Sequence, residues 1–509
     1  MTVYLTGNNL QIQDVIAIAR NYQPVSLDSQ AKKTMLSSYR WVQEASRQEK
    51  AIYGINTGFG SLARIRIPSS QSALLSWNLI RSHAAGIGPV APEDIARATM
   101  LLRANALAKG VSGCRPILVE KLLRFLNQKL TPVIPMKGSC GSSGDLAPLA
   151  HLGLVLIGDP MGEAFLGGVR MPAPEALQKT GIPRLTLQAK DGLAITNGAQ
   201  LSTAIACLSC FDAEQLIKAA ELAAAMSTEA LLGVSRAFHP SVHQLRPYPG
   251  AIRTAHNIRH YFAGSTLIDS VPEKVQDAYS IRCSPQVIGA ARDMYDFVKR
   301  QVSIELNSAT DNPLILLDEP EHNKPFSAGM FHGEPIGMAC DTLKIAISEV
   351  ASISERRLYR LTTGNLSQLL PPGLVGKDRP VLGMIVPQTT AAALVSENKA
   401  LGWPASLDSI PTCEDQEDHI AMSTVAARRC YDVIQNARRV VAIEILTAAH
   451  ALEHRIAHRP SSQLGQGTKV AYANMQNILF DLSNHSTMGE QIEAIAQSIH
   501  NGLLFEGLE

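Results

Sequence analysis

The segment from Gly138 to Gly144 could build an electrophile from backbone atoms alone. It reads Gly-Ser-Cys-Gly-Ser-Ser-Gly and precedes a helical pattern. If the loop is compressed, the Gly144 amide nitrogen can attack the carbonyl carbon of Ser142, because glycine has no Cβ to obstruct the approach. Loss of two waters, which include the Ser143 hydroxyl, would leave a five-membered methylidene-imidazolone ring. On its own, however, Gly-Ser-Ser-Gly is typical of an ordinary turn.

Tyr53 heads a glycine-rich segment that reads Tyr-Gly-Ile-Asn-Thr-Gly-Phe-Gly. At the head of a mobile loop, a tyrosine could reach into a pocket and take a proton. Because the ordinary pKa of a phenol is about 10, a base role needs a neighbouring positive charge or hydrogen bonds to the phenolate. A packed tyrosine in a surface turn is an equally good interpretation of this segment alone.

His83 and Asn197 stand in patterns of small or apolar residues. A histidine in such a setting is more often a satisfied core residue than a functional one. The amide of Asn197 needs hydrogen-bond partners in an apolar helix, so this residue is either a buried structural group or part of a site.

Tyr279 and Arg282 lie three residues apart in the segment that begins at Gln276. On one helical turn, their side chains would face the same way. The guanidinium of Arg282 is suited to bidentate capture of a carboxylate. In isolation, a surface Tyr–Arg pair is the simpler interpretation.

Two later segments contribute an aromatic residue and a cluster of acids. Phe331 lies in Gly-Met-Phe-His-Gly-Glu, and Glu417 lies in Thr-Cys-Glu-Asp-Gln-Glu-Asp-His. Phe331 could line an aromatic pocket. Acids at a predicted helix start are normally explained by the helix dipole.

Taken in their order along the chain, the seven segments resemble the blocks of the aromatic amino acid ammonia-lyases, which carry a methylidene-imidazolone group. The resemblance spans residues 53–419, which is most of the chain. It implies that Ser142-Ser143-Gly144 forms the prosthetic ring, with no external cofactor, and that Tyr53 acts as the base. It implies catalytic roles for Tyr53, Ser142, Ser143, Gly144, Asn197 and Tyr279, and substrate-binding roles for His83, Gln276, Arg282, Phe331 and Glu417.

Three positions depart from the family pattern. Ser142 stands where the family usually has alanine, and Met330 and Asp415 stand where it usually has asparagine. Ser142 would contribute only its carbonyl group and Cα to the ring, so we expect its side chain to be tolerated. The three changes leave a non-catalytic helical paralogue without the prosthetic group as an alternative.

The resemblance implies elimination of ammonia from an aromatic amino acid. Glu417 takes the position at which histidine-specific members place a glutamate beside the imidazole, and His83 favours a polar ring. We therefore expect conversion of L-histidine to trans-urocanate. A tyrosine ammonia-lyase or an aromatic aminomutase with the same ring is the alternative, because His83 is also compatible with a phenol.

The 509 residues are 46% hydrophobic and carry a net charge of +1. This balance predicts a large core and no footprint for nucleic acid or an anionic membrane surface. The first residues lack a basic region followed by an apolar run, so we expect a cytoplasmic protein without a membrane span. Of eight cysteines, only Cys207 and Cys210 are close in sequence, and no second pair or histidine cluster completes a metal site. We expect reduced, structural cysteines and no metal.

Helical periodicity dominates the chain and predicts a mainly α fold. We expect a long-helix bundle over residues 201–509 and a smaller N-terminal lobe, residues 1–200, that carries the Tyr53 and Ser143 loops. A Gly-Gly turn after Phe165 predicts a β-hairpin. The predicted helices cover residues 29–51, 92–110, 116–128, 146–157, 193–234, 285–307, 334–363, 390–400, 416–454 and 492–503, with a loop over residues 371–380.

The apolar helix predicted over residues 193–234 needs cover on all sides, which favours association into an oligomer. The resemblance implies, more specifically, a homotetramer in which each active site draws on three subunits. The substrate expected from the resemblance is a small amino acid.

Overall fold

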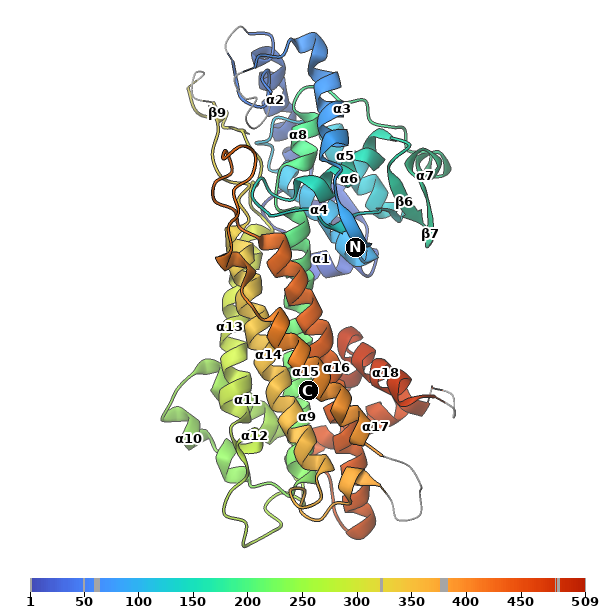
Figure 1. Cartoon of the computed structure of the whole chain (residues 1–509), viewed down its shortest axis with the longest axis vertical. Coiled ribbons are helices and arrows are strands. Elements are labelled where there is room, and N and C mark those ends of the chain that lie inside the picture. Colours follow the sequence, from blue (N-terminus) through green and yellow to red (C-terminus); the bar gives the residue numbers. More distant parts are fainter. Residues whose placement is uncertain are drawn as a thin grey trace. The chain divides into compact units, whose positions relative to one another are not determined.

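The computed structural model describes residues 2–48, 51–58, 65–320, 324–375, 383–480, 482 and 486–508. The chain is mainly helical, as expected, and the strands among these residues are short (Figure 1). It divides into two compact units. The first unit comprises Met1–Leu208, Lys299–Asp341 and Pro404–Arg428, and the second comprises Ser209–Val298, Thr342–Trp403 and Arg429–Glu509. Each unit is assembled from three separate segments, and the expected lobes 1–200 and 201–509 stay a prediction.

The first part of the chain combines helices of up to 17 residues with short strands. Its helices are α1 (Ile12–Ala19), α2 (Ser29–Ala45), α3 (Ser72–His83), α4 (Glu93–Ala108), α5 (Pro116–Asn127), α6 (Leu146–Ile157), α7 (Ala173–Thr180) and α8 (Asp191–Thr196). The strand β1 (Val3–Leu5) pairs in parallel with β2 (Val25–Leu27). The antiparallel pairs join β3 (Ile87–Val90) to β5 (Pro135–Lys137), β4 (Leu130–Pro132) to β6 (Glu163–Leu166), β6 to β7 (Val169–Pro172), and β8 (Leu314–Ile315) to β9 (Pro325–Phe326).

Long helices dominate the remainder. They are α9 (Gln200–Ala230), α13 (Ser284–Glu305), α14 (Glu334–Thr362), α15 (Ile385–Leu401) and α16 (Ser423–His458). The shorter ones are α10 (Pro240–Gln244), α11 (Pro249–Tyr261), α12 (Tyr279–Arg282), α17 (Gln466–Phe480) and α18 (Met488–Asn501). Short 3-10 helices lie at Ser69–Gln71, Ser235–Phe238, Pro372–Leu374, Ala405–Leu407 and Leu503–Phe505.

Two local predictions from the sequence agree closely with the structure. The helix α6 has the bounds predicted for it, residues 146–157. The hairpin of β6 and β7 turns at Gly167 and Gly168, whose φ angles of 59° and 79° are the left-handed values that a two-residue hairpin turn favours.

The single helix predicted over residues 193–234 is wrong, because the chain breaks between α8 and α9. Gly198 lies in this break with a φ of 151°, and a Cβ added there would lie 2.2 Å from the Arg103 guanidinium. A residue with a side chain would not fit this conformation or this space. Asn197 therefore belongs to a break between two helices and not to a helix interior.

The helix predicted over residues 416–454 begins later than expected, at Ser423. Before it, the backbone groups of Thr412 and Glu417 bond to each other at 3.0 and 3.3 Å and close a tight turn. The three residues 413–415 have φ angles between 51° and 62°, which an α-helix does not accept. The acids of this segment thus lie in a turn and not at a helix start.

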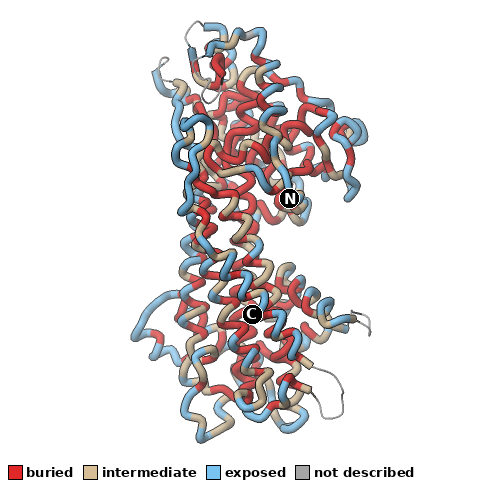
Figure 2. The backbone as a smooth tube through the Cα atoms, in the orientation of Figure 1, coloured by how far each residue is buried: buried red, intermediate tan, exposed pale blue. Residues whose placement is uncertain are grey.

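The helix α9 is buried along almost its whole length in the single chain (Figure 2). The single chain thus supplies most of the cover that the apolar composition of this helix needs, so the burial of α9 does not itself argue for an oligomer.

Among the described residues, no helix is both long and apolar enough to cross a lipid bilayer. Within the residues that the structure describes, no cluster of three or more histidine, cysteine or acidic side chains could hold a metal ion. None of the eight cysteines, all of which are described, forms a disulfide bond. The loop expected over residues 371–380 lies partly outside the described residues.

Candidate active site

The loop between β5 and α6 carries Ser142, Ser143 and Gly144 and is tightly confined. Gly144 has a φ of 68°, and a Cβ added to it would lie 2.2 Å from the carbonyl carbon of Gly198. The two glycines form a parallel β-bridge, so the loop lies directly against the break between α8 and α9. Backbone can approach backbone this closely only where neither residue has a side chain.

Asp145 anchors the C-terminal end of this loop. Its side chain is fully buried, and one carboxylate oxygen accepts hydrogen bonds from the backbone and hydroxyl of Ser202 at 2.8 and 3.0 Å. The other oxygen accepts hydrogen bonds from the hydroxyls of Ser139, at 2.8 Å, and of Thr424. The Asp145 amide also donates to the Gly198 carbonyl at 2.8 Å. Four hydrogen bonds to one buried carboxylate leave this end of the loop little freedom.

The N-terminal side of the loop is held as well. The Gly141 carbonyl accepts a hydrogen bond of 2.9 Å from the Gly333 amide, and the Gly141 amide donates to the Ser139 hydroxyl at 3.1 Å. The side chain of Ser142 is buried, and its hydroxyl has no hydrogen-bond partner among the described residues. A hydroxyl without a partner contributes nothing to holding the loop, which agrees with a bystander role for this side chain.

Ser143 and Glu417, which are far apart in sequence, are brought together in the first unit. The Ser143 hydroxyl donates a hydrogen bond to one carboxylate oxygen of Glu417. The other oxygen accepts a hydrogen bond of 2.6 Å from the Thr412 hydroxyl, within the turn described above. The turn therefore aims the Glu417 carboxylate at the serine of the proposed ring.

His83 lies at the last residue of α3, within electrostatic reach of Glu417. Burial lowers the pKa of the His83 imidazole below its ordinary value of 6.5, although a backbone hydrogen bond and the Glu417 charge oppose this effect. One ring nitrogen, Nδ1, lies 3.0 Å from the Ser82 hydroxyl. A neutral imidazole beside a carboxylate can exchange hydrogen bonds with a polar ring.

Asn197 lies one residue before Gly198 and is almost fully buried. Its side-chain nitrogen donates to Asp311 and to the Asn312 carbonyl, both at 3.3 Å. The backbone carbonyl oxygen of Asn197 accepts a hydrogen bond of 2.7 Å from the Arg103 guanidinium. The structure thus places Asn197 directly before Gly198, the residue that pairs with Gly144.

The segment of Phe331 contacts both the Ser143 loop and the Glu417 segment. Gly333 bonds to Gly141, and a ring nitrogen of His332 lies 3.1 Å from the His419 carbonyl, with the two imidazole rings stacked at 6.0 Å. Phe331 is half-buried at this junction, whereas Met330, one of the departures from the family pattern, is exposed.

Tyr53 is half-buried in the part of its loop that the structure describes, while Phe59 and Gly60 lie outside the described residues. The loop packs against Leu193 of α8 and against Pro313, because a Cβ added to Gly54 would lie 2.8 Å from the first and 3.0 Å from the second.

Gln276, Tyr279 and Arg282 belong to the second unit. The prediction that Tyr279 and Arg282 face the same way is confirmed, because the guanidinium carbon of Arg282 lies 4.7 Å from the centre of the Tyr279 ring. Tyr279 is 71% exposed, and Gln276 is exposed as well. The Nε of Arg282 is buried and has no hydrogen-bond partner among the described residues.

Sequence reasoning missed the residues that hold the site. Asp145 stood directly after the proposed ring residues, but three of its four hydrogen-bond donors come from the distant residues Ser202 and Thr424. Arg103 and Asp311 had no motif of their own, and only the demand that the Asn197 amide be satisfied pointed to such partners.

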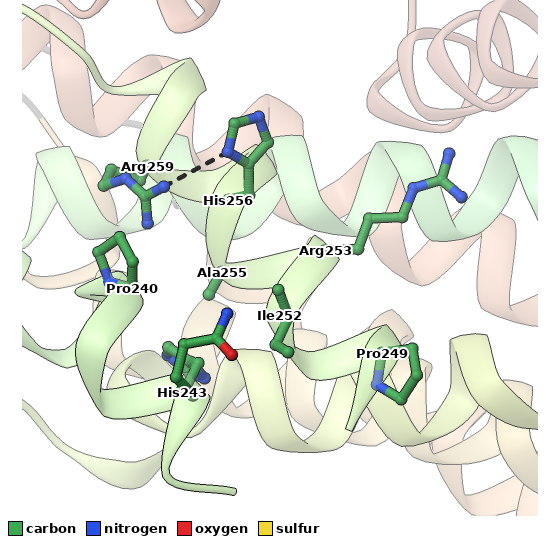
Figure 3. A pocket seen from close by; sticks show the side chains of 9 residues that line it. Pro240, His243, Pro249, Ile252, Arg253, Ala255, His256 and Arg259 are labelled. Atoms are coloured by element: carbon green, nitrogen blue, oxygen red, sulfur yellow. Dashed lines mark hydrogen bonds between the residues drawn. The ribbon is translucent and has the colours of Figure 1, made fainter. Parts of the chain in front are cut away.

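A cavity of about 550 Å³ opens in the second unit between α10 and α11 (Figure 3). Its lining is part apolar and part basic: Pro240, His243, Gln244, Pro249, Ile252, Arg253, Ala255, His256 and Arg259. It contains none of the residues predicted for the site. This cavity therefore does not coincide with the site predicted from the sequence.

Comparisons with known proteins agree with this geometry. The model of the aromatic amino acid lyase family matches residues 10–477. A histidine ammonia-lyase of Caldanaerobacter subterraneus subsp. tengcongensis is 45% identical over 508 residues, which cover 100% of this chain and 98% of that protein. The structure of a histidine ammonia-lyase from Trypanosoma cruzi is 33% identical, with a TM-score of 0.90, and covers 99% of this chain and 94% of that one.

A tyrosine aminomutase from Streptomyces globisporus is equally similar in structure. It is 33% identical, with a TM-score of 0.91 and coverage of 99% of this chain and 98% of that one. The matches in sequence and in structure both extend over almost the whole chain. The protein therefore belongs to the aromatic amino acid lyase family.

Proposed function

We propose that this protein is a histidine ammonia-lyase, a carbon–nitrogen lyase that eliminates ammonia from L-histidine to give trans-urocanate. The observation that carries the proposal is the hydrogen bond from Ser143 to Glu417. It sets a carboxylate beside the serine of the ring-forming sequence, where an imidazole N–H would find an acceptor and an apolar ring would not. The full-length similarity to curated histidine ammonia-lyases supports the same substrate.

The residues of the loop fit a methylidene-imidazolone group formed from Ser142-Ser143-Gly144. Gly144 carries no Cβ that would collide with Gly198, and the hydrogen bonds of Gly141 and Asp145 would hold the loop ends while the ring closes. The ring would supply an electrophilic methylidene carbon without an external cofactor. Asn197, beside the paired backbone of Gly144 and Gly198, would help to hold the amino acid.

The remaining roles follow from the chemistry of the side chains. We propose that Arg282 binds the substrate carboxylate with Gln276 nearby, and that Tyr279 polarises the prosthetic group. Tyr53 would remove the β-proton. His83, Glu417 and Phe331 would surround the imidazole ring, with the neutral His83 and the anionic Glu417 as hydrogen-bond partners.

The exposed ring of Tyr279 supports assembly into a homotetramer, in which other copies of the chain would cover this surface. Location in the cytoplasm stays a prediction from the sequence.

The function is tested by comparing turnover of L-histidine and L-tyrosine in wild-type protein and in Glu417→Gln. We expect wild type to release urocanate from L-histidine. Glu417→Gln removes the anion but keeps the shape, so kcat/KM for L-histidine should fall by about 10- to 100-fold. Glu414→Gln, in the same turn but exposed, is the matched control and should stay near wild type.

Three results would contradict the proposal. Faster conversion of L-tyrosine than of L-histidine would indicate a tyrosine ammonia-lyase, and accumulation of a β-amino acid would indicate an aminomutase. An intact mass without the loss of two waters, together with no turnover, would leave the non-catalytic paralogue as the explanation.

A further inference from the structure

The amide of Asn197 is oriented by two acceptors on the same side. Its side-chain nitrogen lies 3.3 Å from Asp311 Oδ1 and 3.3 Å from the carbonyl oxygen of Asn312. Turning the amide over would bring its oxygen against these two oxygens, with no proton between them. The repulsion fixes the nitrogen toward Asp311 and the oxygen away from it.

Asp311 is in turn fixed by Lys190. The ammonium group lies 2.9 Å from Asp311 Oδ2, and both side chains are almost fully buried. Lys190 also donates to the Asn312 carbonyl at 3.2 Å, and the Asn312 amide donates to Asp311 Oδ1 at 2.7 Å. Each oxygen of the carboxylate therefore has a donor of its own, and the group cannot rotate without losing one.

The oxygen of the Asn197 side chain is left as an acceptor. No described residue donates a hydrogen bond to it, although Arg103 fixes the backbone of the same residue at 2.7 Å. Asn197 lies one residue from Gly198, which pairs with Gly144 of the proposed ring. An acceptor at this place suits an N–H of the substrate and not an oxygen of its carboxylate.

We propose that the Lys190–Asp311 pair is a positioning device that holds the Asn197 amide so that its oxygen accepts an N–H from the amino group of the substrate. The proposal rests on the function proposed above. A buried ion pair contributes little net stability compared with apolar side chains of the same size. Orientation of a reacting partner is the benefit that this pair supplies.

The test separates recognition of the amino group from recognition of the rest of the substrate. It compares kcat/KM for L-histidine with the inhibition constant of 3-(imidazol-4-yl)propanoate, which keeps the ring and the carboxylate but lacks the amine. In Asp311→Asn, the new amide can turn its own nitrogen toward Asn197, so Asn197 is free to turn over. We expect kcat/KM to fall about tenfold and the inhibition constant to change less than about twofold.

Asp191→Asn is the matched control. Asp191, the buried residue next to Lys190, also forms an ion pair, with the partly exposed Arg115 at 2.9 Å, and no hydrogen bond joins it to Asn197. We expect any loss in this variant to affect both ligands alike. If Asp311→Asn does not fold, the double variant Asp311→Asn/Lys190→Gln leaves no unpaired buried charge and serves the same comparison.

The proposal is overturned if Asp311→Asn weakens both ligands equally, as a structural defect would, or leaves both unchanged. Intact mass must show the same two lost waters as in wild type, which separates positioning of the substrate from formation of the ring. Failure of the wild type to convert L-histidine would instead overturn the proposed function. In that case, L-tyrosine with 3-(4-hydroxyphenyl)propanoate, which likewise lacks the amine, tests the positioning role.

Discussion

The Ser143 loop in the first unit and the Tyr279–Arg282 turn in the second unit differ in how completely one chain satisfies them. Around the loop, the buried Asp145 accepts four hydrogen bonds. On the turn, Tyr279 is 71% exposed and the Nε of Arg282 has no partner among the described residues. The polar groups of the first region are therefore satisfied within one chain. The second region contains an exposed aromatic ring and a guanidinium nitrogen without a hydrogen-bond partner among the described residues.

This difference separates two tasks. A loop that must compress its backbone to form a ring needs rigid support from within the fold. A surface that binds a carboxylate needs charged donors, and we propose that the guanidinium of Arg282 supplies them. We therefore expect changes in the first region to affect formation of the prosthetic group, and changes in the second to affect binding of the substrate.

The largest effect is expected for Ser143→Ala, which removes the hydroxyl that would leave as water. Turnover of L-histidine should fall by more than about 10³-fold, because the electrophile cannot form. Intact mass should lack the loss of two waters, while the melting temperature stays close to that of wild type.

The neighbouring variant Ser142→Ala is the control for this experiment. The Ser142 hydroxyl is buried without a partner, so its removal should preserve ring formation and turnover. Equal losses in both variants would show that disturbance of the loop, and not the chemistry of Ser143, abolishes activity.

An intermediate effect is expected for Arg282→Lys, which keeps the charge but loses the fork of the guanidinium. We expect KM for L-histidine to rise about 10- to 100-fold with an unchanged intact mass, because the ring forms in the other region. Arg253→Lys, on an exposed arginine of the same unit, should behave as wild type. A variant without the two lost waters would break the separation of the two tasks.

The smallest effect concerns His83 and pH. Burial lowers the pKa of His83 below 6.5, so the folded protein binds this proton less readily than the unfolded chain. The stability that depends on neutral His83 is complete above about pH 6.5 and is lost as the pH falls through the lowered pKa. Between about pH 7.5 and 5, wild type should lose more stability than His83→Gln.

Melting temperatures across this range provide the measurement. His256→Gln, on an exposed histidine of the second unit, should follow the wild-type profile. Identical profiles for wild type and His83→Gln would mean that His83 does not titrate in this interval.

Local patterns in the sequence predicted the elements whose causes are local. The helix α6 and the Gly167–Gly168 hairpin follow from periodicity and turn chemistry, and both agree with the structure. The break at Gly198 could not be predicted, because the space for a Cβ there is taken by Arg103 from α4. The turn before α16 depends likewise on pairing between Thr412 and Glu417, which periodicity does not record.

For the candidate site, the sequence named the residues that carry reactive groups and missed those that hold them. Ser143 and Glu417 belong to segments with a family pattern, and the structure joins them by a hydrogen bond. Lys190 and Asp311 are 121 positions apart, and each is an ordinary charged residue in its own segment. Only the folded chain shows that they share one buried contact.

The supports of the Ser143 loop also set the moment at which the electrophile could arise. Thr424 bonds to Asp145, and Gly333 bonds to Gly141, so the loop lacks two of its supports until these later segments are made. While a ribosome is still translating the middle of the chain, the sequence around Ser143 has already emerged as an uncompressed peptide. The nascent chain would therefore carry no reactive group, and maturation would wait until most of the 509 residues have been synthesised.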